Sequence, residues 1–147
     1  MDELINSGHL RETIRIIIRN LGVLEKDEAS CCGVTIGQCH AIVENGRAGE
    51  ISLNDLADLL NLDKSTMSRT VNNLVENDLV VRELDNEDRR YVKIKLTEKG
   101  YKAFKRIEET MEQYYRSVLG SIPENKRAQV MESLQLLLEA LKNNKCC

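Results

Sequence analysis

Nine consecutive residues near the middle of the chain include basic, hydroxyl and amide side chains, and none of the nine is acidic. They run from Lys64 to Asn72, and the next acid is Glu76. Such side chains hydrogen-bond to base edges and phosphate oxygens, whereas a carboxylate repels phosphates. The candidate contacts to double-stranded DNA are Lys64, Ser65, Thr66, Ser68, Arg69 and Asn72. An ordinary solvated helix face is the alternative, although such a face more often mixes Glu with Lys.

Two short helices are needed to present those side chains. Ser52 and Asp63 are residues that cap helix N-termini, and each precedes apolar residues at helical spacing. The first apolar series is Leu53, Leu56, Ala57 and Leu60, and the second is Met67, Val71, Leu74 and Val75. This pattern predicts a helix-turn-helix, in which the second helix lies in the major groove of DNA.

A β-hairpin is expected after the second helix, with strands at 79–84 and 91–96. The second strand alternates polar with apolar residues, in the order Tyr91, Val92, Lys93, Ile94, Lys95 and Leu96. That period of two is typical of a β-strand. The loop between the strands ends in Arg89 and Arg90. A basic hairpin beside a recognition helix is a wing, and an arginine at its tip can enter a narrow minor groove.

Three short motifs, together with this order of elements, resemble the MarR family of bacterial winged-helix regulators. They are Ser65-Thr-Met-Ser-Arg69, Asp88-Arg-Arg90 and Leu96-Thr-Glu-Lys-Gly100. The resemblance covers nearly the whole chain. It implies that Arg90 is the wing arginine and that Asp88 holds the wing by an ion pair, with Arg90 as its candidate partner. The alternative for Asp88 is a loop acid that favours the turn.

The resemblance implies a mainly α-helical fold with a small β-wing. A winged helix-turn-helix DNA-binding domain would occupy residues 34–100, and residues 1–30 together with 105–147 would form a helical dimerisation region. A two-fold dimer would present its recognition helices to half-sites about one DNA turn, roughly 34 Å, apart on a pseudo-palindromic operator. A monomeric helical core is the alternative.

Local signals for the flanking helices agree with that scheme. Broad apolar faces recur at helical spacing at both ends of the chain. Thr35 with Gln38, and Ser121 with Glu124, have the spacing of capping boxes, and the second places Pro123 in the first turn of the last helix. Thr97 is expected to cap the long helix that follows the wing.

The net charge of −3 is not typical of a DNA-binding protein, but the distribution of charge is. Residues 64–105 contain 10 Lys and Arg against 7 Asp and Glu, whereas residues 1–63 contain 5 against 11. The positive excess therefore coincides with the proposed DNA-binding half. Neither a signal peptide nor an apolar run long enough to cross a membrane is evident, so a soluble, cytoplasmic protein is expected.

Five cysteines are the second group of residues that could do chemistry: Cys31, Cys32, Cys39, Cys146 and Cys147. In the cytosol such a set indicates thiol chemistry or a bound soft metal or metalloid before structural disulfides. The alternatives are that Cys39 is a small packing residue and that the terminal pair lies on a frayed tail. Cys39 and His40 are neighbours on one helix, where they cannot form a nucleophile–base pair unaided, so an enzyme is not expected.

These observations favour a dimeric, sequence-specific regulator of transcription, most simply a repressor that an effector releases from its operator. Lys64, Arg69, Arg89 and Arg90 would supply phosphate and groove contacts, and the hydroxyl and amide residues would contact bases. No cofactor is required. The effector would act through the cysteine thiols, as a soft metal, metalloid or oxidant, or it would be a small organic ligand. A winged helix that binds only proteins is the remaining alternative.

Overall fold

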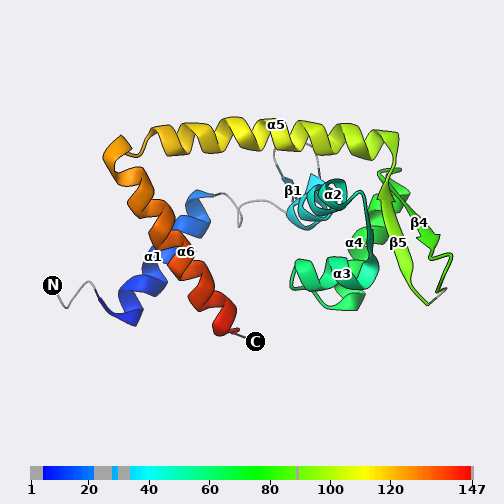
Figure 1. Ribbon diagram of the computed structural model, residues 1–147, viewed down its shortest axis with the longest axis horizontal. Helices are drawn as coiled ribbons and strands as arrows, with labels where there is room; N and C mark the ends of the chain where they lie inside the picture. The colour runs from blue at the N-terminus through cyan, green and yellow to red at the C-terminus, as the bar shows by residue number, and fades with distance from the viewer. Residues whose placement is uncertain (1–4, 22–27, 30–33, 89, 147) are drawn as a thin grey trace. The chain divides into compact units, whose positions relative to one another are not determined.

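The structure is a computed structural model that describes residues 5–21, 28–29, 34–88 and 90–146 (Figure 1). The chain divides into two compact units, residues 1–108 and residues 109–147. The boundary lies within one long helix, α5 (Glu98–Gly120). Among the described helices, none is both long and apolar enough to cross a membrane.

The first unit begins with helix α1 (Ser7–Asn20), which Asn6 caps by accepting from the backbone N–H of His9. Two short antiparallel strands, β1 (Glu28–Ala29) and β2 (Val34–Thr35), follow.

Helix α2 (Ile36–Ala48) starts with the capping box that the sequence predicts. The Thr35 hydroxyl accepts from the Gln38 N–H, the Gln38 side chain accepts from the Thr35 N–H, and both distances are 3.1 Å. The helix ends at Gly49, whose φ of +80° suits a residue without a side chain.

Helices α3 (Leu53–Leu59) and α4 (Lys64–Glu76) form the helix-turn-helix. Ser52 and Asp63 cap them as expected. Most of the predicted apolar residues are buried, and these are Leu56, Ala57, Met67, Val71 and Leu74. Val75 is an exception: it is 39% exposed, so the buried face of α4 is narrower than its sequence suggests.

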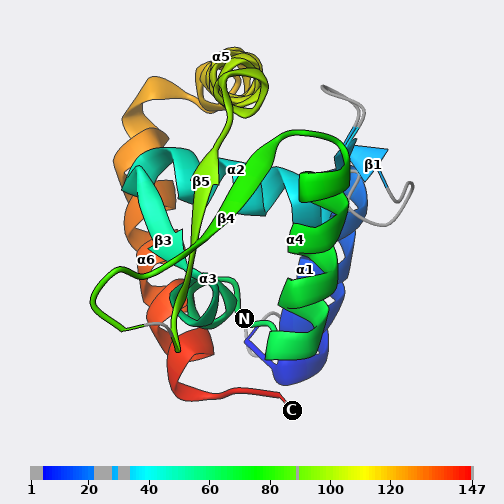
Figure 2. The ribbon, with the colours of Figure 1, turned by 90° about the vertical axis from the view of Figure 1, so that its right-hand side faces the viewer.

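Three antiparallel strands form the wing sheet in the order β3-β5-β4 (Figure 2). They are β3 (Glu50–Ser52), β4 (Val80–Leu84) and β5 (Val92–Leu96). Val80 and Ile94 on one face are buried in the core beside the helices. Because strand side chains alternate between faces, Arg82 lies on the same face as Val80, and Glu83 lies on the opposite, solvent-facing side.

The motif Leu96-Thr-Glu-Lys-Gly100 joins the wing to α5, and the structure gives a physical reason for it. The Thr97 hydroxyl donates to the carbonyl of Asp78 at 2.6 Å and accepts from the Gly100 N–H at 3.0 Å. Lys99 donates to the carbonyl of Asn77 at 3.0 Å. A Cβ at Gly100 would lie only 1.9 Å from the carbonyl oxygen of Leu79, so only glycine fits here. The motif therefore holds the turn that connects the recognition helix to the wing.

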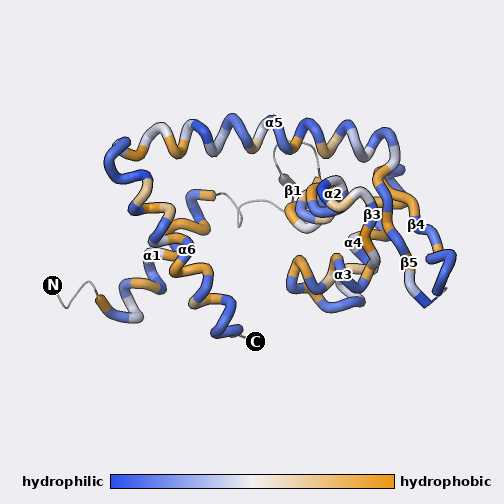
Figure 3. Tube along the Cα trace, viewed as in Figure 1, coloured by the Kyte–Doolittle hydropathy of each residue, from blue (hydrophilic) through white to orange (hydrophobic). Residues whose placement is uncertain are grey.

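The second unit consists of the end of α5, a 3₁₀ turn (Glu124–Lys126) and helix α6 (Arg127–Asn143). The prediction of a capping box from Ser121 to Glu124 is wrong. The Ser121 hydroxyl instead donates back to the carbonyl of Ser117, and α6 begins later without a side-chain cap. Apolar and polar segments alternate along α6 (Figure 3), and its exposed apolar residues are Met131, Leu134, Leu136, Leu138 and Leu141.

Candidate nucleic-acid interface

The exposed face of α4 contains most of the residues that the sequence singles out. Lys64, Ser65, Arg69 and Asn72 are exposed, and Thr66 and Ser68 are half-buried. Met67 and Val71 on the opposite face are fully buried, which fixes how the helix is rotated. The helix therefore turns a polar, partly basic surface away from the core.

Asp63 organises the N-terminal turn of that surface. The hydroxyls of Ser65 and Thr66 both donate to its carboxylate, and its backbone partner is the Thr66 N–H at 3.3 Å. These hydrogen bonds, led by that from Ser65, lower the pKa of Asp63 to about 2. The Thr66 oxygen also accepts from Arg69 at 3.3 Å. Ser65 and Thr66 thus donate their hydrogens within the protein, and they can offer DNA only an acceptor oxygen.

Arg82 is a basic residue at this interface that the sequence did not single out. From β4 it donates to the backbone carbonyl of Ser68 at 3.2 Å and to the Ser68 hydroxyl at 3.5 Å. The contact joins the wing to the middle of the recognition helix. The alternation that places Arg82 on the same face as buried Val80 could have indicated this direction.

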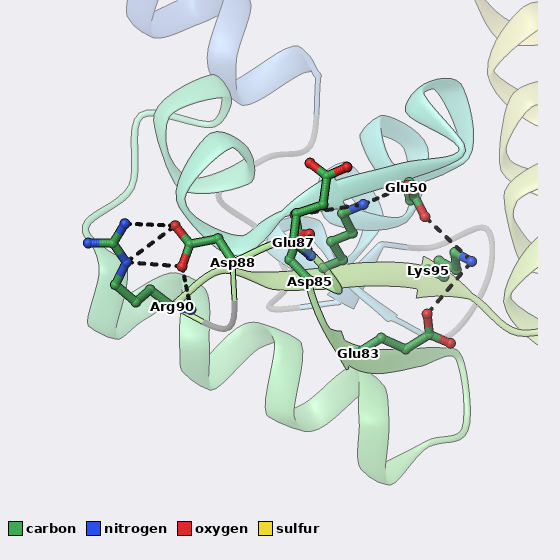
Figure 4. Close-up of polar contacts among 8 residues, drawn as sticks. Glu50, Glu83, Asp85, Glu87, Asp88, Arg90 and Lys95 are labelled. Carbon is green, nitrogen blue, oxygen red and sulfur yellow. Dashed lines mark hydrogen bonds and ion pairs between the residues drawn. The ribbon is translucent and has the colours of Figure 1, made fainter.

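The wing loop contains a close ion pair between Asp88 and Arg90 (Figure 4). Arg90 Nε lies 3.0 Å from Asp88 Oδ1, Nη2 lies 2.8 Å from Oδ2, and the Arg90 N–H also donates to Oδ1 at 3.1 Å. The Arg90 side chain lowers the pKa of Asp88, and Asp88 raises the pKa of Arg90. The Arg90 side chain is nevertheless 86% exposed. Arg89 lies outside the described residues.

The solvent-facing side of the wing sheet is a ladder of alternating charges (Figure 4). Lys93 lies 3.1 Å from Glu50 and 3.8 Å from Asp85, and Lys95 lies 3.4 Å from Glu50 and 3.7 Å from Glu83. The hydrogen bond from Lys93 is the main cause that lowers the pKa of Glu50, and Glu50 in turn raises the pKa of Lys93. The positive charges of Lys93 and Lys95 in the hairpin are therefore balanced by neighbouring carboxylates.

The cysteines are less completely described. Cys39 is half-buried in α2 and Cys146 is exposed beyond the end of α6. Cys31, Cys32 and Cys147 lie outside the described residues. Within the part of the chain that the structure describes, no three His, Cys, Asp or Glu side chains are placed to bind a metal ion.

A model of the MarR family matches residues 33–90, which include the helix-turn-helix, β3 and β4 but end before β5. Over these residues the chain is similar to the MarR family. It is 25% identical over 121 residues to the HTH-type transcriptional regulator BilQ of Clostridium symbiosum, covering 82% of this chain and 84% of BilQ. These similarities indicate a MarR-type DNA-binding transcriptional regulator.

Solved structures agree with this assignment. A MarR transcriptional regulator from Methanosarcina mazei is 28% identical, with a TM-score of 0.72 over 90% of this chain and 99% of that one. FabT of Streptococcus pneumoniae, solved in complex with DNA, is 20% identical and superposes with a TM-score of 0.82 over 94% of this chain and 99% of FabT. The superposition on FabT shows that the fold is MarR-like.

Proposed function

We propose that this MarR-type regulator binds operator DNA as a homodimer, with α4 in the major groove and the β4–β5 hairpin against the adjacent minor groove. The observation that supports this most directly is the exposed face of α4, where Lys64, Arg69 and Asn72 lie together on a helix whose other face is buried. FabT and MepR of S. aureus, which share the fold, were each crystallised with DNA.

The side chains divide into two roles. Lys64, Arg69, Arg89 and Arg90 contact phosphates or enter a groove, because guanidinium and ammonium groups pair with phosphate oxygens. The base contacts come from shorter polar side chains, which are Ser65, Thr66, Ser68 and Asn72. Asp88 holds Arg90 at the wing loop while leaving most of its side chain exposed.

The apolar residues that α1 and α6 leave exposed in a single chain support homodimerisation. On α1 these include Leu10, Ile16 and Ile17, and neither helix has a buried residue among those described. Covering such residues with a second copy removes apolar surface from water. Two recognition helices related by a two-fold axis then match a pseudo-palindromic operator.

The regulator acts as a repressor that an effector releases from DNA. The cysteine content supports a thiol-directed effector, a soft metal, metalloid or oxidant, because thiolates prefer soft ions. In the sequence, Cys31 and Cys32 come shortly before Thr35, the cap of α2, and the dipole at a helix N-terminus favours thiolate. A small organic effector, with cysteines that serve only in packing, is the alternative.

Gel-shift titrations with duplex DNA selected from a random pool test the DNA-binding surface. Arg90→Ala should weaken binding and lower the slope of log K against log salt by about one unit, as expected for one lost phosphate contact. Arg116→Ala on α5 is a matched control, since it removes another largely exposed arginine whose pair, Glu112, lies on the same helix. If both variants bind like the parent, Arg90 does not contact DNA.

The effector is tested with the same duplex under reducing conditions, with oxidant, and with arsenite, cadmium or zinc. A variant with Cys31, Cys32, Cys146 and Cys147 changed to Ser should bind DNA like the parent yet keep it under each treatment. Tenfold release needs only about 1.4 kcal/mol of coupling between effector and DNA. If the parent keeps its DNA under every treatment, the thiols do not sense these agents.

A further inference from the structure

The contact between Arg82 and Ser68 has a consequence for how DNA sequence is recognised. A serine hydroxyl has one hydrogen to donate and two lone pairs that accept. Here the Ser68 oxygen accepts from the guanidinium of Arg82 at 3.5 Å, while the neighbouring carbonyl accepts from the same Nη2 atom at 3.2 Å. The guanidinium has no lone pair to accept a hydrogen, so the hydroxyl hydrogen must be directed away from Arg82.

Ser68 differs in this respect from the other two hydroxyl residues of the candidate DNA surface. Ser65 and Thr66 donate to Asp63. Within the described part of the chain, the Ser68 hydroxyl donates to no protein group. It is also half-buried, so one side of it remains accessible. Ser68 is therefore the hydroxyl of this set that can offer a donor to DNA.

We propose that Arg82 is a positioning residue for base recognition: it fixes Ser68 as a hydrogen-bond donor toward a base-edge acceptor in the major groove. The acceptors there are N7 and O6 of guanine, N7 of adenine and O4 of thymine, whereas cytosine presents an amino donor. The base pair that faces Ser68 is thus one whose contacted base is not cytosine. This inference rests on the proposed placement of α4 in the major groove.

The same contact also links two elements that bind different parts of DNA. Arg82 belongs to β4, and Ser68 lies in the middle of α4, 14 residues earlier in the chain. The carbonyl of Ser68 keeps its ordinary helical hydrogen bond, and its second lone pair accepts from Arg82. Arg82 acts through Ser68 and need not touch DNA itself.

A direct phosphate contact by Arg82 is the competing explanation, and the two make different predictions. Loss of a phosphate contact weakens binding to all sequences alike and lowers the salt slope by about one unit. Loss of a positioning contact leaves the salt slope unchanged and reduces discrimination at one base pair. The size expected for one neutral hydrogen bond is about three- to tenfold.

The experiment measures the affinity of the full-length chain for its selected duplex and for every single base-pair change of it, at several salt concentrations. The variants are Arg82→Gln, Ser68→Ala and the double variant, with Arg106→Ala as a control for loss of one exposed arginine. We expect Arg82→Gln and Ser68→Ala to lose discrimination against cytosine at the same base pair, with no further loss in the double variant and an unchanged salt slope.

Three results would overturn the inference: an unchanged preference at every position in Arg82→Gln, a uniform loss with a lower salt slope, or additive losses in the double variant. If Arg82→Gln does not fold, Arg82→Lys replaces it. Lysine keeps the charge but lacks the planar guanidinium that holds Nη2 against Ser68, so it should show the same local loss of discrimination. A parent protein that selects no duplex at all would contradict the proposed function instead.

Discussion

Replacing Gly100 by alanine should destabilise the first unit, residues 1–108, although alanine is the better helix former. The added methyl carbon would lie 1.9 Å from the carbonyl oxygen of Leu79, whereas real Cβ atoms stay at least 3.0 Å from such a neighbour. That carbonyl cannot simply rotate away, because it accepts from the backbone N–H of Thr97 at 3.0 Å. The backbone must therefore shift and strain or break this hydrogen bond.

The expected loss in the free energy of unfolding follows from three opposing contributions. Overpacking costs about 1–3 kcal/mol, and a weakened backbone hydrogen bond adds about 1 kcal/mol. The helix propensity of alanine returns about 1 kcal/mol. The net result is a destabilisation of about 1–3 kcal/mol, measurable as a lower urea midpoint.

Gly37→Ala is the matched control for this experiment. It lies in α2, and an added Cβ there meets no heavy atom within 4 Å. Alanine at this position should leave the stability unchanged or raise it by up to about 1 kcal/mol. If Gly100→Ala is as stable as Gly37→Ala, the close approach of Gly100 to the Leu79 carbonyl is not the reason that glycine occupies position 100.

Three further predictions concern single side chains. Asn45 is only 1% exposed, and its side-chain amide has no hydrogen-bond partner among the described residues. Asn45→Leu should therefore raise the free energy of unfolding, measured by urea titration, by about 1–3 kcal/mol. A lower free energy of unfolding would show that the amide is satisfied. The lowered pKa of Asp63 means that its stabilising effect is complete above pH about 4 and disappears as pH falls toward about 2. The stability difference between the parent and Asp63→Ala should therefore shrink over that pH interval, and a constant difference would contradict the assignment. Arg69→Ala should cost about 1–3 kcal/mol of binding at one base position if Arg69 contacts guanine, while an equal loss for all sequences would identify it as a phosphate contact.

Local signals in the sequence were sufficient for much of the fold. Thr35, Ser52 and Asp63 cap their helices as predicted, because an N-cap depends on residues within a single turn. The same reasoning failed at Ser121, where the hydroxyl found a partner in the preceding helix. A capping box is only one of the hydrogen bonds open to a serine near a helix end.

Contacts between distant residues could not be predicted in this way. The alternation in β5 correctly predicted a strand, yet it gave no sign that Glu50, 43 residues before Lys93, would balance the charge of that lysine. The role of Gly100 likewise depends on Leu79, which meets it only in the folded chain. The sequence does not pair Arg82 with Ser68, because the two residues belong to different elements.

The balanced charges on the outer side of the wing sheet suggest a way to adjust occupancy of an operator without altering which operator is chosen. Glu50 contacts both Lys93 and Lys95, and it lies outside α4 and the wing loop. Its neutralisation would remove one negative charge beside the wing, where electrostatic steering speeds encounter with DNA. In an engineered gene circuit, such a change would set the response threshold of the regulator, while the base-contacting residues would keep its target unchanged.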